Sequence, residues 1–534
     1  MFFVDIETNR NGKLLAIGAC TDSSVIATFK NWKQVLDFGL RENNEQTWIA
    51  HNGGGFDWLH LLDYTIKSGT LSGYKGIVVG NRVISMTLKL KGYSKTITLI
   101  DSFNLWPVSL NEAAMNLVFR AKIGIEKRPE DLPRSEMLDY LVNDVLLLRD
   151  CYHAFNDAIC DLGYSGKPRI TLASTALAVY ESMTGIVIRN VSDFLNNTIA
   201  SSYTGGRVQL FKSGKHDDVK VYDVNSMYPY VMSKHRYPFN GDYDTTNWYH
   251  HSECTFIQCS FDINNSKSEF LSPIIRSGKP IANGTMLISS PEFEALDSIG
   301  ARIKVFECYK MINNDYIFTD YINNLYAIKT GKGKLAFVAK LLMNSLYGKY
   351  GQNPIGSELV LGQQCESIID LTPLGGDIFE RETEREVAHR HVAIASLVTA
   401  HSRIKLWNDI DESTIYCDTD SIHTTKTLAT GKKLGDYKLE FEGKGIYLGK
   451  KLYTLIPKDG GKEKVVAKGI RHKDDPVYHG NAALKSSDFS LLADDASAKM
   501  SCEFDAMPTL REVLSGDYHP CKPIRRKRRI RQIK

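Results

Sequence analysis

Two acidic stretches far apart in the chain constrain its fold more than any other feature. In YCDTDSIH, Asp418 and Asp420 alternate with apolar and β-branched residues, so a strand would place both carboxylates on one face. A third carboxylate, Asp223, follows the β-rich run VKVYDV. Neighbouring carboxylates repel unless a cation lies between them, and a divalent metal is the usual one. The sequence therefore predicts strands from separate regions that meet at a two-metal site for in-line phosphoryl transfer.

A third motif, KLLMNSLYGKYG, supplies groups that such chemistry needs around a nucleotide. We expect a helix here, in which Lys340, Asn344 and Tyr347 recur at i, i+4 and i+7 on one face. A helix buried on that face would carry leucine at these positions instead. A cation, an amide and a phenol along one stripe suit a triphosphate, a sugar and a base.

In chain order, D-x-N-S-x-Y-P, K-x3-N-S-x-Y-G and Y-x-D-T-D-S resemble motifs A, B and C of family B DNA polymerases. The resemblance implies that Asp223 and Asp420 are metal ligands and that Asp418 supports the site from nearby. It also implies that Lys340 contacts the triphosphate, with Lys329 of the AIKTGKGK loop as a second candidate. Other side chains are implied around the nucleotide: Tyr228 beneath the sugar, Tyr347 against the nascent base pair, and Asn344 as a support of the helix.

The N-terminal segment FFVDIETN carries a second acidic pattern, because a strand there puts Asp5 and Glu7 on one face. The segments HNGGGFDWLHLL and DYLVNDVLLLRD add Asp57 and Asp144, and Tyr140 precedes Asp144 by one helical turn. Together these residues resemble the ExoI, ExoII and ExoIII motifs of DEDDy-type 3′–5′ exonucleases. The resemblance implies two metals held by the four acids, with Tyr140 orienting the attacking water.

Several further residues suit contacts with DNA. Asn52 and Phe56 suit a frayed 3′ terminus, because an aromatic face stacks on any base. Lys122, in KIGI, resembles a family lysine that contacts the scissile phosphate, and a solvated surface lysine is the alternative. SYTGGR resembles the Y-x-G-G element whose glycines admit the template backbone, and KKLYTL resembles a K-x-Y grip on the primer terminus, with both side chains on one strand face. The residues concerned are Tyr203, Gly205, Gly206, Arg207, Lys451 and Tyr453.

Composition fits a soluble protein of several structural units. A chain of 534 residues, with 43% hydrophobic and 24% charged residues, is too long for one core. Its ten cysteines form no C-x2-C pair, so a reducing cytoplasm is expected and a disulfide framework or zinc site is not. No apolar run is long enough to span a membrane. The last ten residues carry seven Lys or Arg and no acid, and we expect a solvated tail or a contact with phosphates.

The resemblance implies an α/β and α+β multidomain fold, in which a ribonuclease H-like 3′–5′ exonuclease domain precedes a palm, fingers and thumb with two TPR insertions. Long intervals after motif A and after motif B resemble the spacing in protein-primed polymerases of bacteriophages and linear plasmids. The expected order is exonuclease 1–165, first part of the palm 166–235, TPR1-like insertion 236–316, fingers 317–351, TPR2-like insertion 352–386, second part of the palm 387–484, and thumb with basic tail 485–534.

The predicted function is that of a DNA-directed DNA polymerase with a proofreading 3′–5′ exonuclease, which starts on a hydroxyl of a terminal protein and displaces the strand ahead. The expected cofactor is Mg²⁺, two ions per active site, which Mn²⁺ can replace. The expected partners are primer-template DNA, deoxynucleoside triphosphates and the terminal protein, with the enzyme a monomer in the cytoplasm of a host cell and not bound to a membrane. Two alternatives stay open: a nucleic-acid-primed compact viral family B polymerase, and a DNA-binding protein with inactive sites, against which the presence of every acid argues.

Overall fold

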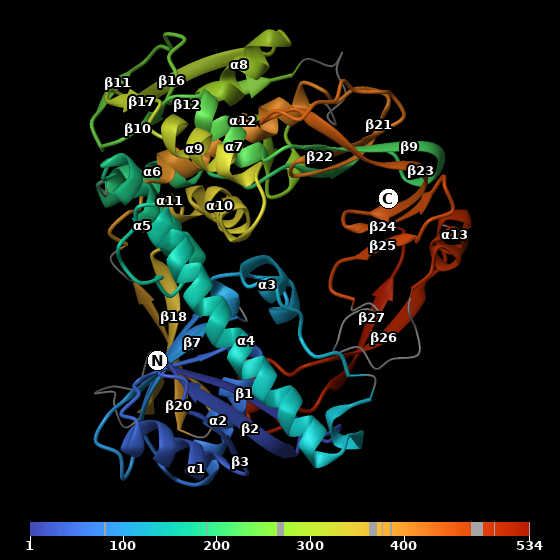
Figure 1. Cartoon of the computed structure of the whole chain (residues 1–534). Coiled ribbons are helices and arrows are strands. Elements are labelled where there is room, and N and C mark those ends of the chain that lie inside the picture. Colours follow the sequence, from blue (N-terminus) through green and yellow to red (C-terminus); the bar gives the residue numbers. More distant parts are fainter. Residues whose placement is uncertain are drawn as a thin grey trace.

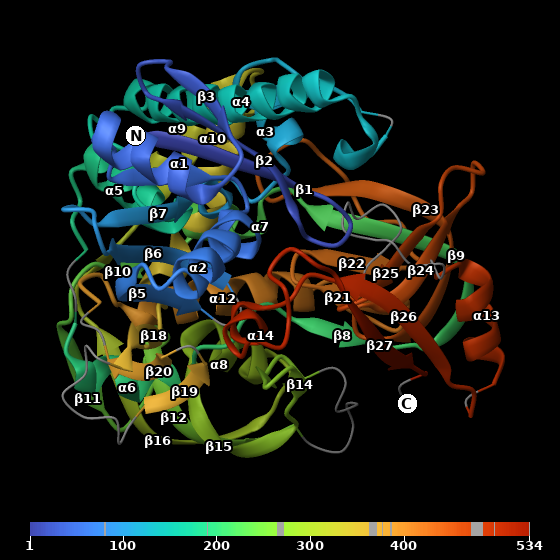
Figure 2. The ribbon, with the colours of Figure 1, turned by 90° about the horizontal axis from the view of Figure 1, so that it is seen from below.

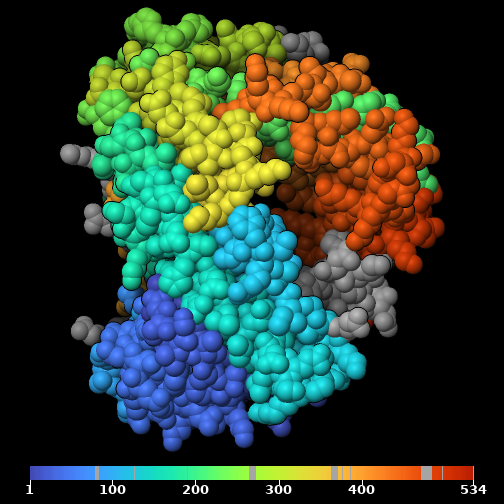
Figure 3. All heavy atoms as spheres, in the orientation of Figure 1, coloured from blue at the N-terminus to red at the C-terminus, as the bar shows by residue number. Residues whose placement is uncertain are grey.

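The computed structural model describes the chain from residue 1 to 532, apart from 80–81, 126, 189–190, 264–271, 363–370, 376, 385–386, 471–483 and 496. Figure 1 shows two lobes, with the N-terminal sheet in the lower one. The long helix α4 (Arg134–Asp161) runs between the lobes on one side, and strands β26 (Met500–Ala506) and β27 (Ile524–Ile530) lie between them on the other. The space-filling view shows the surface hollowed between these two connections (Figure 3).

The lower lobe is built on a mixed sheet of ten strands. Along β1, Val4 and Ile6 are buried whereas Asp5 and Glu7 are half-buried, because successive side chains of a strand point to opposite faces. Strand β1 lies parallel to β4, and β4 lies parallel to β7. The strands follow the order β19 (Leu371–Gly375), β20 (Ile378–Glu384), β18 (Ile355–Leu361), β5 (Leu71–Val79), β6 (Arg82–Leu90), β7 (Ile97–Asp101), β4 (Thr47–Ala50), β1 (Phe2–Thr8), β2 (Leu14–Thr21) and β3 (Ile26–Phe29).

Helices cover both faces of this sheet. Helix α4 lies on β1 and β2, and α1 (Trp32–Leu36) and α2 (Asp57–Lys67) belong to the core on the opposite face. That core also includes residues from the far end of the chain, because α14 (Leu510–Leu514) packs against α2 (Figure 2). The segment expected as the TPR2-like insertion supplies β18, β19 and β20, which extend the N-terminal sheet through the pairing of β18 with β5.

The second large sheet carries the other acidic motifs. Its core faces α7 (Met227–Lys234) and α12 (Val392–Trp407), and α13 (Ser486–Asp494) packs on its outer strands. Its seven strands follow the order β25 (Lys464–Ala467), β24 (Leu452–Pro457), β23 (Tyr437–Gly449), β9 (Gly214–Val224), β22 (Ser421–Thr424), β21 (Thr414–Asp418) and β8 (Val208–Leu210).

Between motifs A and B lies a smaller sheet with its own core. Its order is β11 (Tyr243–Thr246), β16 (Arg302–Met311), β12 (Thr255–Asp262) and β15 (Asn283–Ser289), and α8 (Ser290–Ser298) follows directly. Short pairs join β10 (Tyr237–Pro238) to β17 (Asn314–Asp315) and β13 (Ile275–Arg276) to β14 (Lys279–Pro280). The remaining helices are α3 (Leu110–Leu117), α5 (Leu172–Thr184), α6 (Asp193–Ala200), α9 (Thr319–Lys329), α10 (Lys334–Ser345) and α11 (Tyr347–Tyr350).

The basic run at the C-terminus is a strand, so the expectation of a solvated tail is wrong for 524–530. Strand β27 pairs antiparallel with β26 along its whole length. Arg525 forms ion pairs with Glu503 and Asp505 of β26, and Arg526 pairs with Glu512. Strand β26 and α14 thus supply acidic partners for part of the run, which the sequence of the run by itself does not reveal.

Two further observations concern the whole described chain. The nine cysteines within it are all free, in line with the expected lack of disulfides. Among its helices, none combines the length and apolar character needed to cross a membrane.

Candidate active sites

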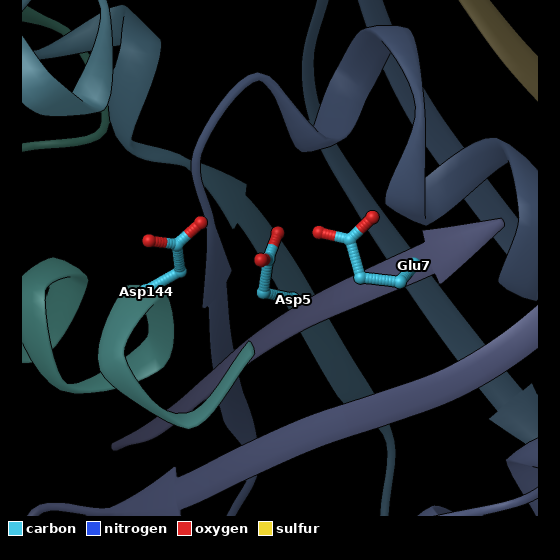
Figure 4. A group of neighbouring side chains, drawn as sticks. All are labelled: Asp5, Glu7 and Asp144. Atoms are coloured by element: carbon cyan, nitrogen blue, oxygen red, sulfur yellow. The ribbon is translucent and has the colours of Figure 1, made fainter. Parts of the chain in front are cut away.

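The N-terminal acids converge where β1 faces α4. Asp5 and Glu7 project from β1 and Asp144 from α4, and their three carboxylates point into a common space (Figure 4). One ligand oxygen from each residue lies within 4.8 Å of the other two. The predicted contribution of a strand and a helix to one acid cluster is therefore present in the fold.

Burial and mutual repulsion strongly perturb this cluster. Burial, and then the Asp144 carboxylate, raise the pKa of Asp5 to about 7. Burial, and then Asp5, raise the pKa of Glu7 to about 8. Within the described chain, the buried Oδ1 atom of Asp144 has no hydrogen-bond partner. Hard carboxylate oxygens held this close, one of them without a donor, fit a divalent cation.

Asp57 lies beside this group rather than within it. It begins α2, is 2% exposed, and its Oδ1 accepts a hydrogen bond from the backbone N–H of Ile6 at 3.1 Å. Burial, and then Asp5, raise its pKa well above the usual range. In this conformation Asp57 fixes the backbone of β1 between the two other acids.

Lys122 and Tyr140 lie at the open side of the cluster. The Lys122 ammonium pairs with Oδ2 of Asp144, and its Nζ lies 5.0 Å from the centre of the Tyr140 ring. Burial raises the pKa of Tyr140 to about 12, so the phenol keeps its proton. The alternative of a solvated surface position for Lys122 does not hold, because its side chain is 27% exposed and paired with a buried acid.

A cavity of about 580 Å³ opens beside Glu7 and Phe56. Asn52 adopts a left-handed conformation (φ 60°) one residue before the glycine run, at the start of the turn that leads to Phe56. The C-terminal region contributes Lys522 and Arg525 to the lining, and Arg10 and Arg128 add two further cations. Two acids of the same lining, Glu130 and Asp505, form ion pairs with Arg10 and Arg525. The sequence motifs do not predict these four cations. The basic composition of the C-terminal region is the one feature of the sequence that indicates Lys522 and Arg525.

Asp223 and Asp420 come together through strand pairing in the second sheet. Asp223 is the next-to-last residue of β9, and its register partner is Ser421, which follows Asp420. The backbone N–H of Val224 donates to the Asp420 carbonyl oxygen at 2.9 Å. We expected Asp418 and Asp420 to lie on one strand, and that prediction is wrong. Strand β21 ends at Asp418, Thr419 forms a turn with φ 64°, and β22 begins at Ser421.

These aspartates are also perturbed by burial. Burial, and then the Asp420 carboxylate, raise the pKa of Asp223 to about 7. Burial raises the pKa of Asp420. Glu440 of β23 contributes to both shifts and was not anticipated. Its place follows from the register, since Lys438, two residues earlier, is the partner of Asp223.

Asp418 is held by protein groups, as a supporting residue would be. The Tyr416 hydroxyl donates to its Oδ2 at 3.1 Å, the Thr419 hydroxyl donates to its Oδ1 at 3.2 Å, and the Lys451 ammonium lies 3.0 Å from Oδ1. Tyr453 packs against Tyr416 with ring centres 5.2 Å apart and is 7% exposed. The expectation that Lys451 and Tyr453 share one strand face is wrong, because Lys451 lies in a left-handed turn before β24.

The lysines around motif B lie at different depths. The Lys329 ammonium donates to the Ser226 hydroxyl at 2.7 Å, and burial, and then the charge of Lys340, lower its pKa. Lys340 and Asn344 are exposed on α10, where the Asn344 amide donates to the Lys340 carbonyl oxygen at 2.9 Å. The Lys329 charge lowers the pKa of Asp223, so Lys329 lies near this carboxylate, although the sequence favoured Lys340 for the triphosphate.

The rings of Tyr228 and Tyr347 form an aromatic pair. Their ring centres are 4.3 Å apart, with 32° between the ring planes. The expected continuous helix through Tyr347 is wrong, because α10 ends at Ser345 and α11 begins at Tyr347. This break turns Tyr347 toward Tyr228 of α7, away from the exposed stripe of Lys340.

The Y-x-G-G-R segment differs most from its expected role. The Arg207 side chain is fully buried and donates to the Gln209 side chain and, at 2.9 Å, to the carbonyl oxygen of Ser272, so the expected DNA contact by this side chain is wrong. An added Cβ at Gly206 would lie 2.7 Å from the Thr419 side chain, so this glycine admits protein rather than template. Gly205 faces open space, and Tyr203 is half-buried.

More than half of the chain, residues 121–432, matches a family model described as DNA polymerase type B, organellar and viral. The chain belongs to this family. This confirms the expected family B DNA polymerase. Membership also implies that divalent metal ions take part in the reaction.

Curated relatives agree with this assignment. A DNA-directed DNA polymerase of Enterobacteria phage PRD1 is 28% identical over 458 residues, which cover 79% of this chain and 75% of the relative. The DNA polymerase of Bacillus phage phi29 is 27% identical and covers 70% of this chain and 69% of the relative. A probable DNA polymerase of Podospora anserina is 25% identical, and the match covers 74% of this chain but 41% of that longer protein.

Solved structures share the fold. The ternary complex of phi29 DNA polymerase with primer-template DNA and incoming nucleotides superposes with a TM-score of 0.75, at 17% identity over 100% of both chains. Its post-translocation binary complex with primer-template DNA gives 0.70, at 20% identity over 88% of this chain and 92% of the other. The expected multidomain polymerase fold is therefore confirmed over the whole chain.

Proposed function

We propose that this DNA polymerase extends primers at the Asp223–Asp420 site and removes mispaired 3′ ends at the Asp5–Glu7–Asp144 site. The observation that carries the proposal is the presence of two acid groups on two separate sheets. Each group has a lysine and a tyrosine close by: Lys122 and Tyr140 in the lower lobe, Lys329 and Tyr228 in the upper. Such pairs suit a phosphate and the group that must be oriented against it.

At the polymerase site, Asp223 and Asp420 are the proposed ligands of two Mg²⁺ ions, which Mn²⁺ can replace. When bound, the metals stabilise negative charge on the phosphates of the incoming nucleotide. Lys329 and Lys340 neutralise the triphosphate from two sides. The Tyr228 ring, backed by Tyr347, closes the space beside C2′ of the sugar and so favours deoxynucleotides. Lys451 grips the primer terminus, and Asn344 supports the helix that carries Lys340.

At the exonuclease site, Asp5, Glu7 and Asp144 are the proposed metal ligands, with Asp57 as a fourth acid behind them. Lys122 exchanges its pairing with Asp144 for the scissile phosphate when a strand enters. Tyr140 orients the attacking water. Asn52 and Phe56 hold the last nucleotide, and the cavity beside them, with its four cations, receives the preceding phosphates.

The domain boundaries expected from the sequence are proposed in the same form, as a ribonuclease H-like exonuclease followed by a polymerase with two TPR insertions.

The strands of the second insertion touch the C-terminal region. Glu380 of β20 pairs with Arg511 of α14, and Gly375 lies so close to Leu514 that an added Cβ would be 2.0 Å from its carbonyl oxygen. This contact links the lower lobe to the thumb and favours a ring around DNA that displaces the strand ahead.

The proposed start of synthesis is the hydroxyl of a terminal protein, with the polymerase acting as a monomer in the host cytoplasm. The long intervals around motif B, which the relatives from phages accommodate in a shared fold, support this start. A nucleic-acid primer is the second candidate. Incubation with a labelled deoxynucleotide, Mg²⁺ and a candidate terminal protein should give a covalent nucleotide–protein product, and extension of DNA primers alone would favour the second candidate.

One assay tests the core of the proposal. Primer extension should require Mg²⁺ or Mn²⁺ and stop when the metal is chelated, and digestion of a mismatched 3′ end should show the same requirement. A chain that binds primer-template DNA but adds no nucleotide under any metal would overturn the proposal in favour of an inactive binding protein.

A further inference from the structure

A buried ionic network joins the small sheet between motifs A and B to the polymerase site. Glu292, in the first turn of α8, has no exposed surface, and neither has Arg403 of α12. The Glu292 Oε1 atom accepts from Arg403 Nη2 at 2.8 Å and from Arg276 Nη1 at 2.8 Å. Its Oε2 atom accepts from the backbone N–H and the hydroxyl of Ser289, both at 3.1 Å. The carboxylate is therefore held from every side.

Arg403 uses its other terminal nitrogen to hold a loop. Its Nη1 donates to the carbonyl oxygen of Gly205 at 3.0 Å and also to that of Thr204. A guanidinium is planar and has fixed donor directions, so an acceptor at Nη2 sets the direction of Nη1. The orientation of Arg403, and with it the position of this loop, depends on Glu292.

The Thr204–Gly206 loop in turn contacts the turn at Thr419. Gly206 lies against Thr419, where an added Cβ would approach the Thr419 Cα to 3.1 Å. The Thr419 N–H donates to the Arg207 carbonyl oxygen at 2.7 Å. Because Thr419 lies between Asp418 and Asp420 in the chain, the loop fixes the backbone that aims both carboxylates.

Glu292 is fully buried, and within the described chain its carboxylate accepts hydrogen bonds from Ser289, Arg276 and Arg403, so its charge is used inside the protein. Buried ion pairs also add little net stability compared with apolar side chains of the same size, since desolvation offsets their attraction. A carboxylate that binds two arginines by directed hydrogen bonds is instead suited to fixing geometry. Its partner Arg276 contacts the same carboxylate but has no contact with the loop among the hydrogen bonds of the described residues.

We propose that Glu292 is a positioning residue for nucleotide addition, acting through Arg403 and the Thr204–Gly206 loop on the turn that carries Asp420. The inference rests on the proposed polymerase function and deepens it. It gives the small inserted sheet a role in the geometry of the polymerase site.

Two single variants separate positioning from stability. Glu292→Gln keeps the shape of the side chain and removes the charge that fixes Arg403, whereas Arg276→Gln weakens the same network on the side away from the loop. We expect kcat for nucleotide addition to fall about tenfold to a hundredfold in Glu292→Gln, because a small displacement of reacting groups has effects of this order. The KM for the deoxynucleotide should change little. In Arg276→Gln, kcat should stay within about twofold of that of the unchanged protein.

Thermal unfolding and digestion of single strands serve as controls in both variants. The assays are run below the unfolding transition of each, and exonuclease activity should be equal in all three proteins. Equal losses of kcat in the two variants would show that the network acts through stability and would overturn the proposal. A Glu292→Gln protein with unchanged kcat would do the same.

A readout without catalysis distinguishes failure of this inference from failure of the proposed function. Hydrogen exchange at the Thr419 amide should be faster in Glu292→Gln than in Arg276→Gln, because that amide is protected by the Arg207 carbonyl oxygen. If the chain adds no nucleotide at all, the exchange experiment still tests the mechanical link. Equal protection in the two variants would refute the link whatever the activity.

Discussion

Three of the proposed exonuclease acids, Asp5, Glu7 and Asp144, each place one oxygen within 4.8 Å of the others, whereas Asp223, Asp418 and Asp420, which the structure also describes, form no such group. The first group draws on a strand and a helix packed in one lobe, and a lysine already pairs with one of its acids. The second draws on β9 and on a turn between β21 and β22, and one of its acids is committed to Tyr416 and Lys451.

The two sites differ in what holds their carboxylates in position. Packing holds the carboxylates of Asp5, Glu7 and Asp144 together against their repulsion, which Lys122 offsets only in part, because the pKa values of Asp5 and Glu7 stay raised. The carboxylates of the proposed polymerase site are aimed by backbone contacts of β9, β22 and the turn at Thr419. The two reactions are therefore expected to fail independently.

The largest expected effect is that of Asp420→Ala. Nucleotide addition should fall by about a thousandfold or more, since a proposed metal ligand is lost, while digestion of single strands survives. Gel assays of both activities on one preparation measure this. Loss of digestion in a folded variant would show that the two sites depend on each other, contrary to this expectation.

The converse change is Asp5→Ala combined with Glu7→Ala. Exonuclease activity should fall by a similar factor, extension should remain, and the error rate should rise through lost proofreading. The measurement is removal of a mismatched 3′ end followed by sequencing of products. A double variant that still removes the mismatch would exclude these acids from the site.

Metal binding in the absence of DNA tests whether the two groups of acids differ in being preassembled. The DNA-free protein should bind Mn²⁺ at the preassembled exonuclease group, and Asp5→Asn with Glu7→Gln should weaken that binding by at least about tenfold. Asp420→Asn should leave it unchanged. Titration followed by electron paramagnetic resonance reports free Mn²⁺, and an equal effect of the two changes would show that neither group is preassembled.

A moderate effect is expected at the aromatic pair of Tyr228 and Tyr347. Tyr228→Val should open space beside C2′ and raise ribonucleotide use relative to deoxynucleotide use by about tenfold or more. Tyr347→Leu is the control, because it removes the backing ring and leaves Tyr228 in place. Unchanged sugar selection in the Tyr228 variant would contradict the proposed contact.

The smallest effect concerns pH. The arginines beside Glu292 hold its pKa at about 2 although burial opposes them, against an ordinary value of 4.5. Because the folded value is depressed, this stabilisation is present above pH 4.5 and is lost as pH falls toward 2. The difference in Tm between the unchanged protein and Glu292→Gln should therefore narrow below pH 4.5. A gap that stays constant down to pH 3 would contradict this.

Sequence alone predicts the parts of both sites that depend on local alternation or on family motifs. Asp5 and Glu7 share a face of β1 because β-strands alternate, and the Lys122 position was expected from the resemblance. The turn at Thr419 was missed because its left-handed backbone depends on the Gly206 contact, 213 residues away (419 − 206).

Partners distant in the chain explain the other errors. Arg207 reads as a basic residue beside two glycines, yet the carbonyl oxygen of Ser272, 65 residues on, receives its hydrogen bond inside the protein. Glu292 and Arg403 lie 111 residues apart, and nothing near either of them in the sequence marks an ion pair. Local patterns carry no information about such pairings.

The shared sheet of the lower lobe has a consequence for how this protein is made. Strand β5 acquires its second neighbour, β18, only after the ribosome has added about 280 more residues, and the core beneath it waits for Leu510 and Leu514. The N-terminal lobe is thus translated first and finished last. Until then, the edge of β5 is an unpaired template for other strands, and long-range pairing of this kind is slow. The nascent chain therefore exposes that edge until residues 355–361 have left the ribosome.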